Sequence, residues 1–241
     1  MDNIYVVLLG KSVIAFPRVP HLYRTRRFMK YNVYRKCFKR VFDIVISIIS
    51  LVLLSPVLFL LSVLGIVFMD GNPFFVQKRT GKEGNTFSLI KFRSMNNKHD
   101  DYGNLLPDDE RLSKYGRFIR TTSLDELPEL INILKGDMSL VGPRPLLIEY
   151  LPYYTEVERC RFDVLPGLTG LAQINGRNAI DWDTKLSYDV QYVQDITFRK
   201  DLIIVLKTFF KVLKRSDIQL GREFKTGKFI EQRKELLEKQ K

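Results

Sequence analysis

The stretch "SLVLLSPVLFLL", residues 50–61, places Ser55 and Pro56 in the middle of a long apolar segment. This segment runs from Val41 to Met69, and Asp43 is its single charged residue. As one straight helix with a rise of ~1.5 Å per residue it would be about 43 Å long, which permits a tilted span of a ~30 Å hydrocarbon core. No small-residue cleavage site follows it, so we expect a retained segment and not a cleaved signal peptide.

Ser55 and Pro56 favour a break at the centre of this segment. Proline has no N–H, so the carbonyl of Val52 would lose its helical partner in a medium without water, and the Ser55 hydroxyl lies beside it. A break there leaves two arms, residues 41–55 and 57–69, each too short to cross a bilayer alone. A re-entrant hairpin in one leaflet fits this pattern. The residues alone nevertheless favour a kinked membrane span, because membrane helices tolerate proline.

Basic residues flank the apolar segment on both sides: Arg35, Lys36, Lys39 and Arg40 before it, and Lys78, Arg79 and Lys82 after it. A single span would place the positive excess on one side, so we expect both ends on the cytoplasmic face. Residues 17–40 hold nine Lys or Arg and no acid, with interleaved aromatic residues, a composition that suits nucleic acid or lipid headgroups. The adjacent apolar segment favours the membrane surface, and a disordered tail is the alternative.

The composition of the whole chain limits its class. It has 241 residues, 45% of them apolar, and a formal charge of +12, which indicates an anionic partner such as nucleic acid, anionic lipid or a phosphorylated substrate. Cys37 and Cys160 lie far apart without nearby histidines, so neither a zinc site nor a disulfide framework is indicated. We expect four parts: a basic and aromatic segment at 1–40, the membrane hairpin at 41–69, a cytoplasmic catalytic domain at 70–220 and a charged, solvated tail at 221–241.

Residues 72–95, "NPFFVQKRTGKEGNTFSLIKFRSM", alternate apolar and polar side chains around a turn between Gly81 and Gly84. This pattern predicts a β-hairpin, and the alternation puts Lys91 and Arg93 on one face of the second strand. Together with Arg79 on the first strand, this cluster could hold phosphate groups. The alternative is an exposed strand whose charges are solvated.

The segment "RTTSLDELPELINILKGDMSLVGPRP" begins at residue 120 and carries two adjacent acids, Asp125 and Glu126. Its apolar residues at i, i+3, i+4 and i+7 predict a helix of about ten residues that ends at Gly136, with the two acids at its start. Spacing alone favours a structural interpretation, because Ser123 and Glu126 match a capping box and acids are favoured in a first helical turn.

Arginines on both sides of this helix give the two acids a second interpretation. Arg120 lies five residues before Asp125, and Pro143-Arg144-Pro145 fixes another arginine on a stiff loop shortly after the helix. Two carboxylates flanked by two guanidinium groups suit phosphoryl transfer, in which anions must approach each other. The two interpretations are compatible, because a helix start favours anions in either case.

Four motifs in order carry a resemblance to a known family: "KRVFDIVIS" leading into the apolar segment, "VQKRTGKEGNTFSLIKFRSM", the segment from residue 120 and "LPGLTGLAQINGR". Residues 35–215 resemble the bacterial sugar transferase family, in the short form of the monotopic phosphoglycosyl transferases that initiate capsule, O-antigen and glycoprotein glycan assembly. The resemblance implies transfer of a sugar 1-phosphate from a UDP-sugar to undecaprenyl phosphate, with release of UMP and with Mg²⁺. It also implies a re-entrant hairpin at Ser55-Pro56, on the cytoplasmic face of the bacterial inner membrane.

The resemblance assigns roles to individual residues. Asp125 matches the nucleophile of the family's acidic dyad and Glu126 its neighbour, and one or both would hold Mg²⁺. Further positions match polar residues that the family needs for activity: Lys91, Arg120, Arg144 and Asp201. We expect Arg144, as a clamp, and Arg120 and Lys91 to bind substrate phosphate. Asp201, Arg79 and Arg93 would support them.

The resemblance also predicts the architecture and the course of the reaction. We expect an α+β protein with a re-entrant membrane hairpin, a small β-hairpin and amphipathic helices at the membrane interface, one of them at 201–215 with a core helix as the alternative. A carboxylate is ionised at pH 7, so Asp125 could attack the diphosphate and form an aspartyl phosphosugar, which predicts ping-pong kinetics. Asn175 and Arg177 lie in a loop that would contact the nucleotide-sugar or form a structural Ω-loop.

The sequence also bears on the donor sugar and on two rival classes of protein. The short form and the "NGRNAIDWDTK" loop favour an N-acetylated amino sugar, and galactose or glucose would suit the same scaffold. A nucleic-acid binding module would explain the charge but neither the hairpin nor the dyad. A non-catalytic membrane scaffold that binds polyanions would not need Asp125, Arg120 and Arg144 together. We therefore expect UDP-sugar, undecaprenyl phosphate and membrane lipid as partners, and no nucleic acid.

Overall fold

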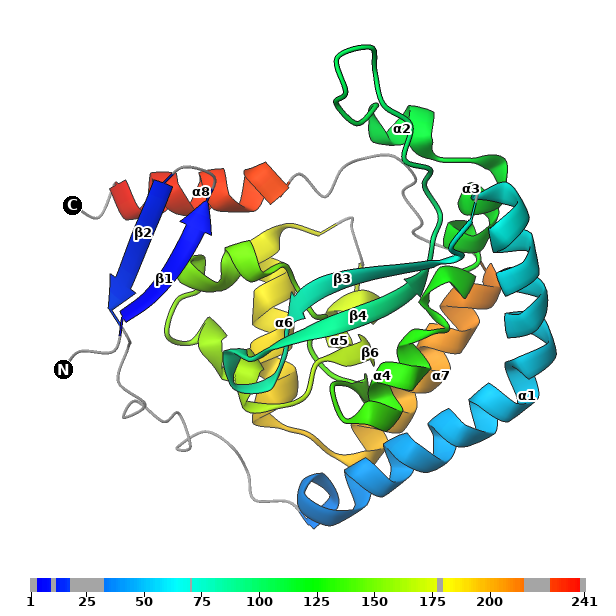
Figure 1. The fold of residues 1–241 in the computed structure, drawn as a ribbon. Coiled ribbons are helices and arrows are strands. Elements are labelled where there is room, and N and C mark those ends of the chain that lie inside the picture. The colour runs from blue at the N-terminus through cyan, green and yellow to red at the C-terminus, as the bar shows by residue number, and fades with distance from the viewer. Residues whose placement is uncertain are drawn as a thin grey trace.

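The computed structural model describes residues 4–9, 12–17, 33–69, 71–176, 180–214 and 226–238. This part of the chain contains helices and three two-stranded sheets (Figure 1), which confirms the mixed helix and sheet class. The strands are β1 (Ile4–Leu9), β2 (Ser12–Pro17), β3 (Phe74–Thr80), β4 (Thr86–Phe92), β5 (Ser139–Val141) and β6 (Gly167–Thr169). The α-helices are α1 (Lys39–Phe68), α2 (Asp108–Arg111), α3 (Lys114–Thr121), α4 (Glu129–Lys135), α5 (Leu171–Ile174), α6 (Trp182–Gln194), α7 (Phe198–Lys214) and α8 (Thr226–Glu238).

The predicted β-hairpin is confirmed. Strands β3 and β4 pair antiparallel, from Thr80 opposite Thr86 at the turn to Phe74 opposite Phe92 at the open end. The turn itself is a short helical turn, η3 (Lys82–Gly84). Phe75 pairs with Lys91, and paired residues share a face of the sheet. Lys91 therefore lies on the same face as Phe75, Gln77 and Arg79 of β3.

The main core lies where α4, β5, α6 and α7 meet. Its buried residues include Ile133 from α4, Val141 from β5, Tyr192 from α6 and Ile204 from α7. Strand β5 pairs in parallel with β6, with Ser139 opposite Gly167, and thereby joins the loop after α4 to the segment that leads into α5. This core is the rigid support from which the polar loops extend.

The apolar segment forms one long helix. Residues Tyr34–Phe68 are long and apolar enough to cross a membrane, by length and composition, and most of this surface is exposed. The two arms predicted at 41–55 and 57–69 are not separate helices, because the helical backbone of α1 continues through Pro56. The Ser55 hydroxyl donates a hydrogen bond of 2.8 Å to the Val52 carbonyl, which satisfies the acceptor that proline leaves unpaired. The helix therefore curves around one side of the molecule without a break (Figure 1).

The first half of α1 is fixed to the core by polar contacts. Asp43, the single charge of the apolar segment, is buried and accepts a hydrogen bond of 3.1 Å from the Leu140 amide on β5. Arg40 donates to the carbonyls of Ile133 at 2.7 Å and Leu134 at 3.2 Å, the last turn of α4. A cation on these carbonyls satisfies the end of α4 and suits the negative end of its dipole.

The second half of α1 returns to the same domain. Leu61 packs in a cluster with Phe92 of β4 and Tyr115 of α3, and the Tyr115 hydroxyl donates to the Leu61 carbonyl at 2.9 Å. Gly65 lies against Pro73, at the start of the β-hairpin, so closely that a Cβ there would lie 2.7 Å from the proline ring. Both ends of α1 are thus packed on one domain, while side chains at its middle such as Leu53 are exposed.

The segment with the two acids differs from its prediction. Residues Leu124–Glu126 form a short 3-10 turn, η4, and α4 begins only at Glu129 and ends, as predicted, at Gly136 with φ +96°. The proposed capping box is wrong, because Ser123 caps nothing with its side chain and has a left-handed backbone with φ +55°. A non-glycine residue in that region is strained, and such strain is typical of sites that position a functional side chain.

The last two helices also refine the predictions. Helix α7 buries Asp201 and Ile204 in the core but leaves a row of apolar side chains exposed: Leu202, Ile203, Leu206, Phe209, Phe210 and Leu213. The amphipathic helix and the core helix are therefore both partly right. The expected solvated tail is wrong for α8, because Phe229 is fully buried and Arg233 nearly so.

Candidate active site

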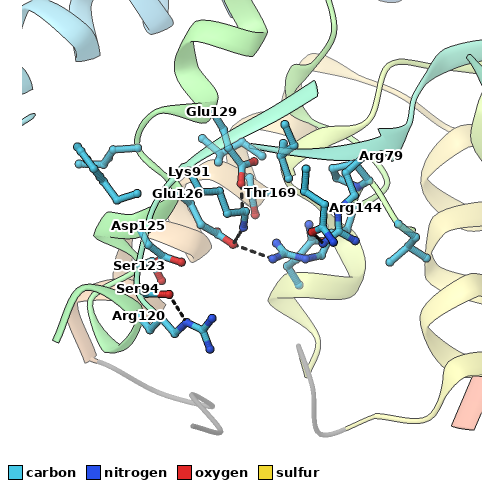
Figure 2. Close-up of a pocket in the computed structure, with 18 of the residues that line it drawn as sticks. Arg79, Lys91, Ser94, Arg120, Ser123, Asp125, Glu126, Glu129, Arg144 and Thr169 are labelled. Atoms are coloured by element: carbon cyan, nitrogen blue, oxygen red, sulfur yellow. Dashed lines mark hydrogen bonds and ion pairs between the residues drawn. The ribbon is translucent and has the colours of Figure 1, made fainter. Parts of the chain in front are cut away.

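A pocket of about 1250 Å³ lies between the β3–β4 hairpin, the η4 turn, the Pro-Arg-Pro loop and helices α5, α6 and α7. It brings together seven of the residues singled out in the sequence: Arg79, Lys91, Arg93, Arg120, Asp125, Glu126 and Arg144. They come from five separate parts of the chain, which the sequence could only connect through the family resemblance. The pocket walls thus carry two adjacent acids among cationic side chains, of which Figure 2 labels Arg79, Lys91, Arg120 and Arg144.

Glu126 is held by two cations. Its Oε1 accepts from Lys91 Nζ at 2.8 Å and from Arg144 Nη2 at 2.7 Å (Figure 2). Removal from bulk water alone would raise the pKa of Glu126, but Arg144 and Lys91 outweigh it and hold that pKa well below its usual range. Glu126 is therefore a permanently ionised carboxylate that orients the two cations.

Asp125 is the free carboxylate of the dyad. It points into the same pocket (Figure 2), and none of the residues that the structure describes donates a hydrogen bond to it. Burial, and then the charge of Glu126, raise the pKa of Asp125 to about 6, against the opposing pull of Lys91, Arg120 and Arg144. An ionised carboxylate with unoccupied lone pairs is what a nucleophile requires.

Glu129 is a third acid of the site that sequence reasoning missed. Its side chain is 2% exposed, and its Oε1 lies 3.0 Å from Lys91 Nζ. Burial raises the pKa of Glu129 to about 7, and the neighbouring Glu126 adds to the rise. The sequence held one signal, because Glu129 lies four residues before the buried Ile133 and so on the inward face of α4.

Lys91 is the centre of this network. Burial opposes its charge, but the two carboxylates Glu126 and Glu129 raise its pKa above the usual value for lysine. Lys91 is therefore charged throughout the physiological range. Because Lys91 lies on β4 and the acids on η4 and α4, the ion pairs join the β-hairpin to the η4 turn and to α4.

Arg144 is positioned by a buried ion pair. Arg161 donates from Nη2 to the Arg144 carbonyl at 2.7 Å and to Asp189 Oδ2 at 2.9 Å, with a further bond from Nε to the same oxygen at 3.2 Å. Both Arg161 and Asp189 are buried. The backbone of the Pro-Arg-Pro loop is thus fixed from behind while the Arg144 side chain reaches Glu126.

The side chains of Arg79 and Arg120 also line the pocket, but they are held less firmly. Arg79 donates from Nη2 to Gln77 Oε1 at 2.6 Å, and burial together with the nearby charge of Arg144 lowers the pKa of Arg79 to about 10. Its Nε is buried and makes no hydrogen bond with the described residues. Arg120 donates from Nε to Ser94 Oγ at 2.7 Å. These guanidinium groups keep donors available for an anion.

A sequence model of the bacterial sugar transferase family matches residues 34–215. The chain belongs to the bacterial sugar transferase family. It is 52% identical over 182 residues to an uncharacterized sugar transferase, EpsL, of Bacillus subtilis, which covers 75% of this chain and 90% of that protein. It is 42% identical over 195 residues to an undecaprenyl-phosphate galactose phosphotransferase of Salmonella typhimurium, and 38% identical over 184 residues to a UDP-glucose:undecaprenyl-phosphate glucose-1-phosphate transferase of Klebsiella pneumoniae.

The lengths of these relatives differ. The last two matches cover 73% and 72% of this sugar transferase but only 40% of each relative, so the chain spans about two-fifths of their length. The match with EpsL covers nearly all of that protein. Helix α8 lies beyond the residues that the family model matches.

Two predicted site residues of this sugar transferase, Asp201 and Asn175, are not brought into the pocket. Asp201 is buried at the start of α7, where its carboxylate accepts from Lys39 Nζ at 2.6 Å and from the hydroxyls of Tyr34 and Tyr192. It therefore joins α7 to the start of α1. Asn175 is exposed outside the pocket wall and donates to the Leu171 carbonyl at 2.9 Å, and Arg177 lies outside the described residues.

The oxygen donors of the sugar transferase fit a magnesium ion that is shared with a substrate. No cluster of three or more His, Cys, Asp or Glu side chains suited to a metal occurs among the described residues. Mg²⁺ commonly takes one or two carboxylates, with water and substrate phosphate as the other ligands. Asp125 has free oxygens for this purpose, whereas Oε1 of Glu126 is already taken by two cations.

Proposed function

We propose that this chain transfers a sugar 1-phosphate from a UDP-sugar to undecaprenyl phosphate, with release of UMP. The observation that carries the proposal is the difference between the two acids. The Glu126 carboxylate is ion-paired with Lys91 and Arg144, and the Asp125 carboxylate is free of such a partner among the described residues. The names of the Salmonella and Klebsiella relatives support the same reaction class. The pocket offers an unpaired nucleophile in a cationic cavity of a size that suits a nucleotide-sugar.

In the first half of the reaction, the Asp125 carboxylate attacks the phosphorus that bears the sugar. A bond forms between Asp125 Oδ and phosphorus, and the bond from phosphorus to the bridging oxygen breaks. The electron pair of that bond goes to UMP, which leaves as an anion. The product on the enzyme is an aspartyl phosphosugar, a mixed anhydride that splits one transfer into two steps.

In the second half, an oxygen of undecaprenyl phosphate attacks the same phosphorus. The new phosphoanhydride bond forms as the bond to Asp125 breaks, and the carboxylate is regenerated with its electron pair. No proton needs to be moved at either step, because both nucleophiles are anions at pH 7. The reaction therefore calls for cations, which the described pocket lining supplies, and for no general base.

The cationic side chains offset the repulsion between the anionic nucleophile and the anionic diphosphate. An anionic nucleophile approaches an anionic diphosphate in both steps, so fixed positive groups lower the barrier where charge accumulates. Arg144 and Arg79 would meet phosphate oxygens from the Pro-Arg-Pro loop and β3, and Arg120 from α3. Mg²⁺, when bound by Asp125, would supply further charge neutralisation at the diphosphate.

The membrane placement belongs to the same proposal. Both ends of α1 pack on one domain, through Asp43 and Arg40 at the start and through Leu61 and Gly65 at the end. This arrangement supports a re-entrant segment with both flanks on the cytoplasmic face, in preference to a span with flanks on opposite faces. The exposed apolar middle of α1 would then enter one leaflet and hold the pocket near the lipid phosphate.

Two classes of donor sugar suit the proposed reaction. The loop sequence at residues 175–185 favours an N-acetylated amino sugar, whereas the names of the relatives from Salmonella and Klebsiella mention galactose and glucose. Both classes would place the same diphosphate against Asp125. A donor panel of UDP-galactose, UDP-glucose and UDP-N-acetylglucosamine distinguishes them.

The test is UMP release by the purified protein in nanodiscs with undecaprenyl phosphate and Mg²⁺. We expect UMP with one donor of the panel and none with the Asp125→Asn variant, whose side chain keeps the size but loses the charge. Release of UDP would indicate ordinary glycosyl transfer and contradict the proposal. If no donor gives a product, while polyanions bind with a steep salt dependence, the chain is a scaffold and not an enzyme.

A further inference from the structure

Helix α8 lies outside the part of the chain that matches the family, yet it packs against the wall of the pocket. In Figure 1 it lies across the molecule from α1, beside the segment that contains η5 (Ile148–Tyr153). The pocket wall on this side includes Tyr150 of η5 and Trp182 of α6. Helix α8 therefore lies behind the end of the pocket that is farther from α1.

Phe229 anchors α8 in an aromatic cluster. Its ring is fully buried, with centroids 4.8 Å from Tyr150 and 4.9 Å from Trp182. Tyr150 and Trp182 also pack edge to face with each other at 5.4 Å. Because the two pocket residues share Phe229 as a neighbour, removal of that ring would leave a cavity directly behind the wall.

Arg233 fixes the same face of α8 one turn later. Its Nη2 lies 2.6 Å from Glu158 Oε1 and 2.8 Å from Asp183 Oδ1. Glu158 belongs to η6 (Glu158–Asp163), and Asp183 follows Trp182 in the first turn of α6. The two ion pairs fix α8 to η6 and to α6, the helix that carries Trp182 at the pocket wall.

A second connection leads from α8 to the catalytic loop. The Phe229 ring lies 5.8 Å from the ring of Tyr154, whose hydroxyl accepts from Arg161 Nη1 at 3.0 Å. Arg161 in turn donates to the Arg144 carbonyl at 2.7 Å. Packing of α8 thus supports both an aromatic wall and, through one buried arginine, the loop of the phosphate clamp.

We propose that α8 is a positioning element for the donor: Phe229 and Arg233 hold Trp182 and Tyr150 in place at the pocket wall where the nucleotide-sugar binds. The inference rests on the proposed function for the identity of the donor. It does not concern the lipid acceptor, which must approach from the side of α1. Loss of the anchor would therefore weaken donor binding more than acceptor binding.

The test compares full-length variants in nanodiscs. Phe229→Ala removes the ring, Phe229→Leu keeps most of its volume, and Arg233→Gln removes the two ion pairs. Lys234→Ala is the matched control, because Lys234 is exposed on the same helix. Thermal unfolding shows which variants are folded, and if Phe229→Ala is not, Phe229→Leu and Arg233→Gln carry the test.

We expect the donor KM to rise about three- to tenfold in Phe229→Ala, the cost of ordering one or two freed side chains on binding. The rise should be smaller in Phe229→Leu and absent in Lys234→Ala, with the KM for undecaprenyl phosphate unchanged. Donor KM values within twofold of the wild type for both folded Phe229 and Arg233 variants would overturn the inference. An equal rise of the donor and acceptor KM would also overturn it, because that indicates a general structural role.

Trp182 supplies a second readout that needs no turnover. It is the single tryptophan of the chain, so its fluorescence reports on the pocket wall alone. Titration with UDP should change the emission in the wild type, and the apparent Kd should rise in Phe229→Ala but not in Lys234→Ala. A wild type that binds UDP in this way but releases no UMP would refute the proposed reaction and leave the role of α8 intact. An unchanged Kd in a folded Phe229→Ala variant would refute the role of α8.

Discussion

Arg144 Nη2 lies 2.7 Å from Glu126 Oε1, so one carboxylate of the acidic dyad is paired within the protein itself. The neighbouring Asp125 has no such partner among the described residues. Two adjacent acids thus have two different tasks, set by their surroundings. Lys91 and Arg144 determine which of the two is free to react.

The dyad variants should differ in kind. Asp125→Asn should lower the rate of UMP release by at least about a thousandfold, because it removes the nucleophile. Glu126→Gln should lower it by about a hundredfold, because Arg144 and Lys91 lose the charge that orients them. Single-turnover UMP release measures both. Equal activity of Asp125→Asn and the wild type would contradict the assigned nucleophile.

The rate should increase with pH through about 6. Burial disfavours the charged form of Asp125 and raises its pKa to about 6, so protonation below that pH removes the nucleophile. We expect kcat/KM for the donor to fall about tenfold per unit below pH 5. Glu129, with a pKa of about 7, is the other candidate for this titration, and the Glu129→Gln variant tests it. The profile near pH 6 should persist in that variant, and its disappearance would assign the titration to Glu129.

Gly116 should be required for the placement of Arg120. A Cβ on Gly116 would collide with the backbone of Ser94, whose hydroxyl holds Arg120. Gly116→Ala should therefore lower the free energy of unfolding by about 1–3 kcal/mol and reduce activity beyond that loss. Arg117→Ala, on the exposed side of α3, is the control. A Gly116→Ala variant as stable and active as the control would contradict this close packing.

Both flanks of α1 should lie on one side of the membrane. Cys37 is exposed before α1, and Cys160 is buried, so the natural thiols provide a reporter for the first flank. Lys78→Cys adds one on the exposed β3 strand beyond α1. In sealed vesicles, a membrane-impermeant maleimide should label both from the same side, and Leu53→Cys in the middle of α1 should be protected. Labelling of the two flanks from opposite sides would instead indicate a span.

The sequence predicted local structure where a pattern is repeated along the chain. Strict alternation indicated the β3–β4 hairpin, and the placement of Gly136 indicated the end of α4. The predicted capping box does not form, because Ser123 and Glu126 line the pocket instead. Ser123 has a strained backbone, and the Glu126 side chain is ion-paired with Arg144. Local rules are least reliable where side chains are used for chemistry.

Contacts between distant segments could not be derived from the sequence. Arg161 and Asp189 are ordinary charged residues in the sequence, and only the fold shows that they fix the Arg144 carbonyl. The charged appearance of α8 likewise concealed Phe229, a single aromatic residue in a polar helix. Asp201 was expected near the site, but the fold uses it to join α7 to Lys39 at the start of α1.

The central claim is that Asp125 carries the sugar phosphate during the reaction. The most direct measurement is intact and peptide mass spectrometry of the protein after incubation with the active UDP-sugar and Mg²⁺, without undecaprenyl phosphate. We expect one equivalent of UMP per active site, and an added mass of the sugar phosphate on the peptide that contains Asp125, absent in Asp125→Asn. UMP release that requires undecaprenyl phosphate, with no adduct on the protein, would contradict it and indicate direct transfer.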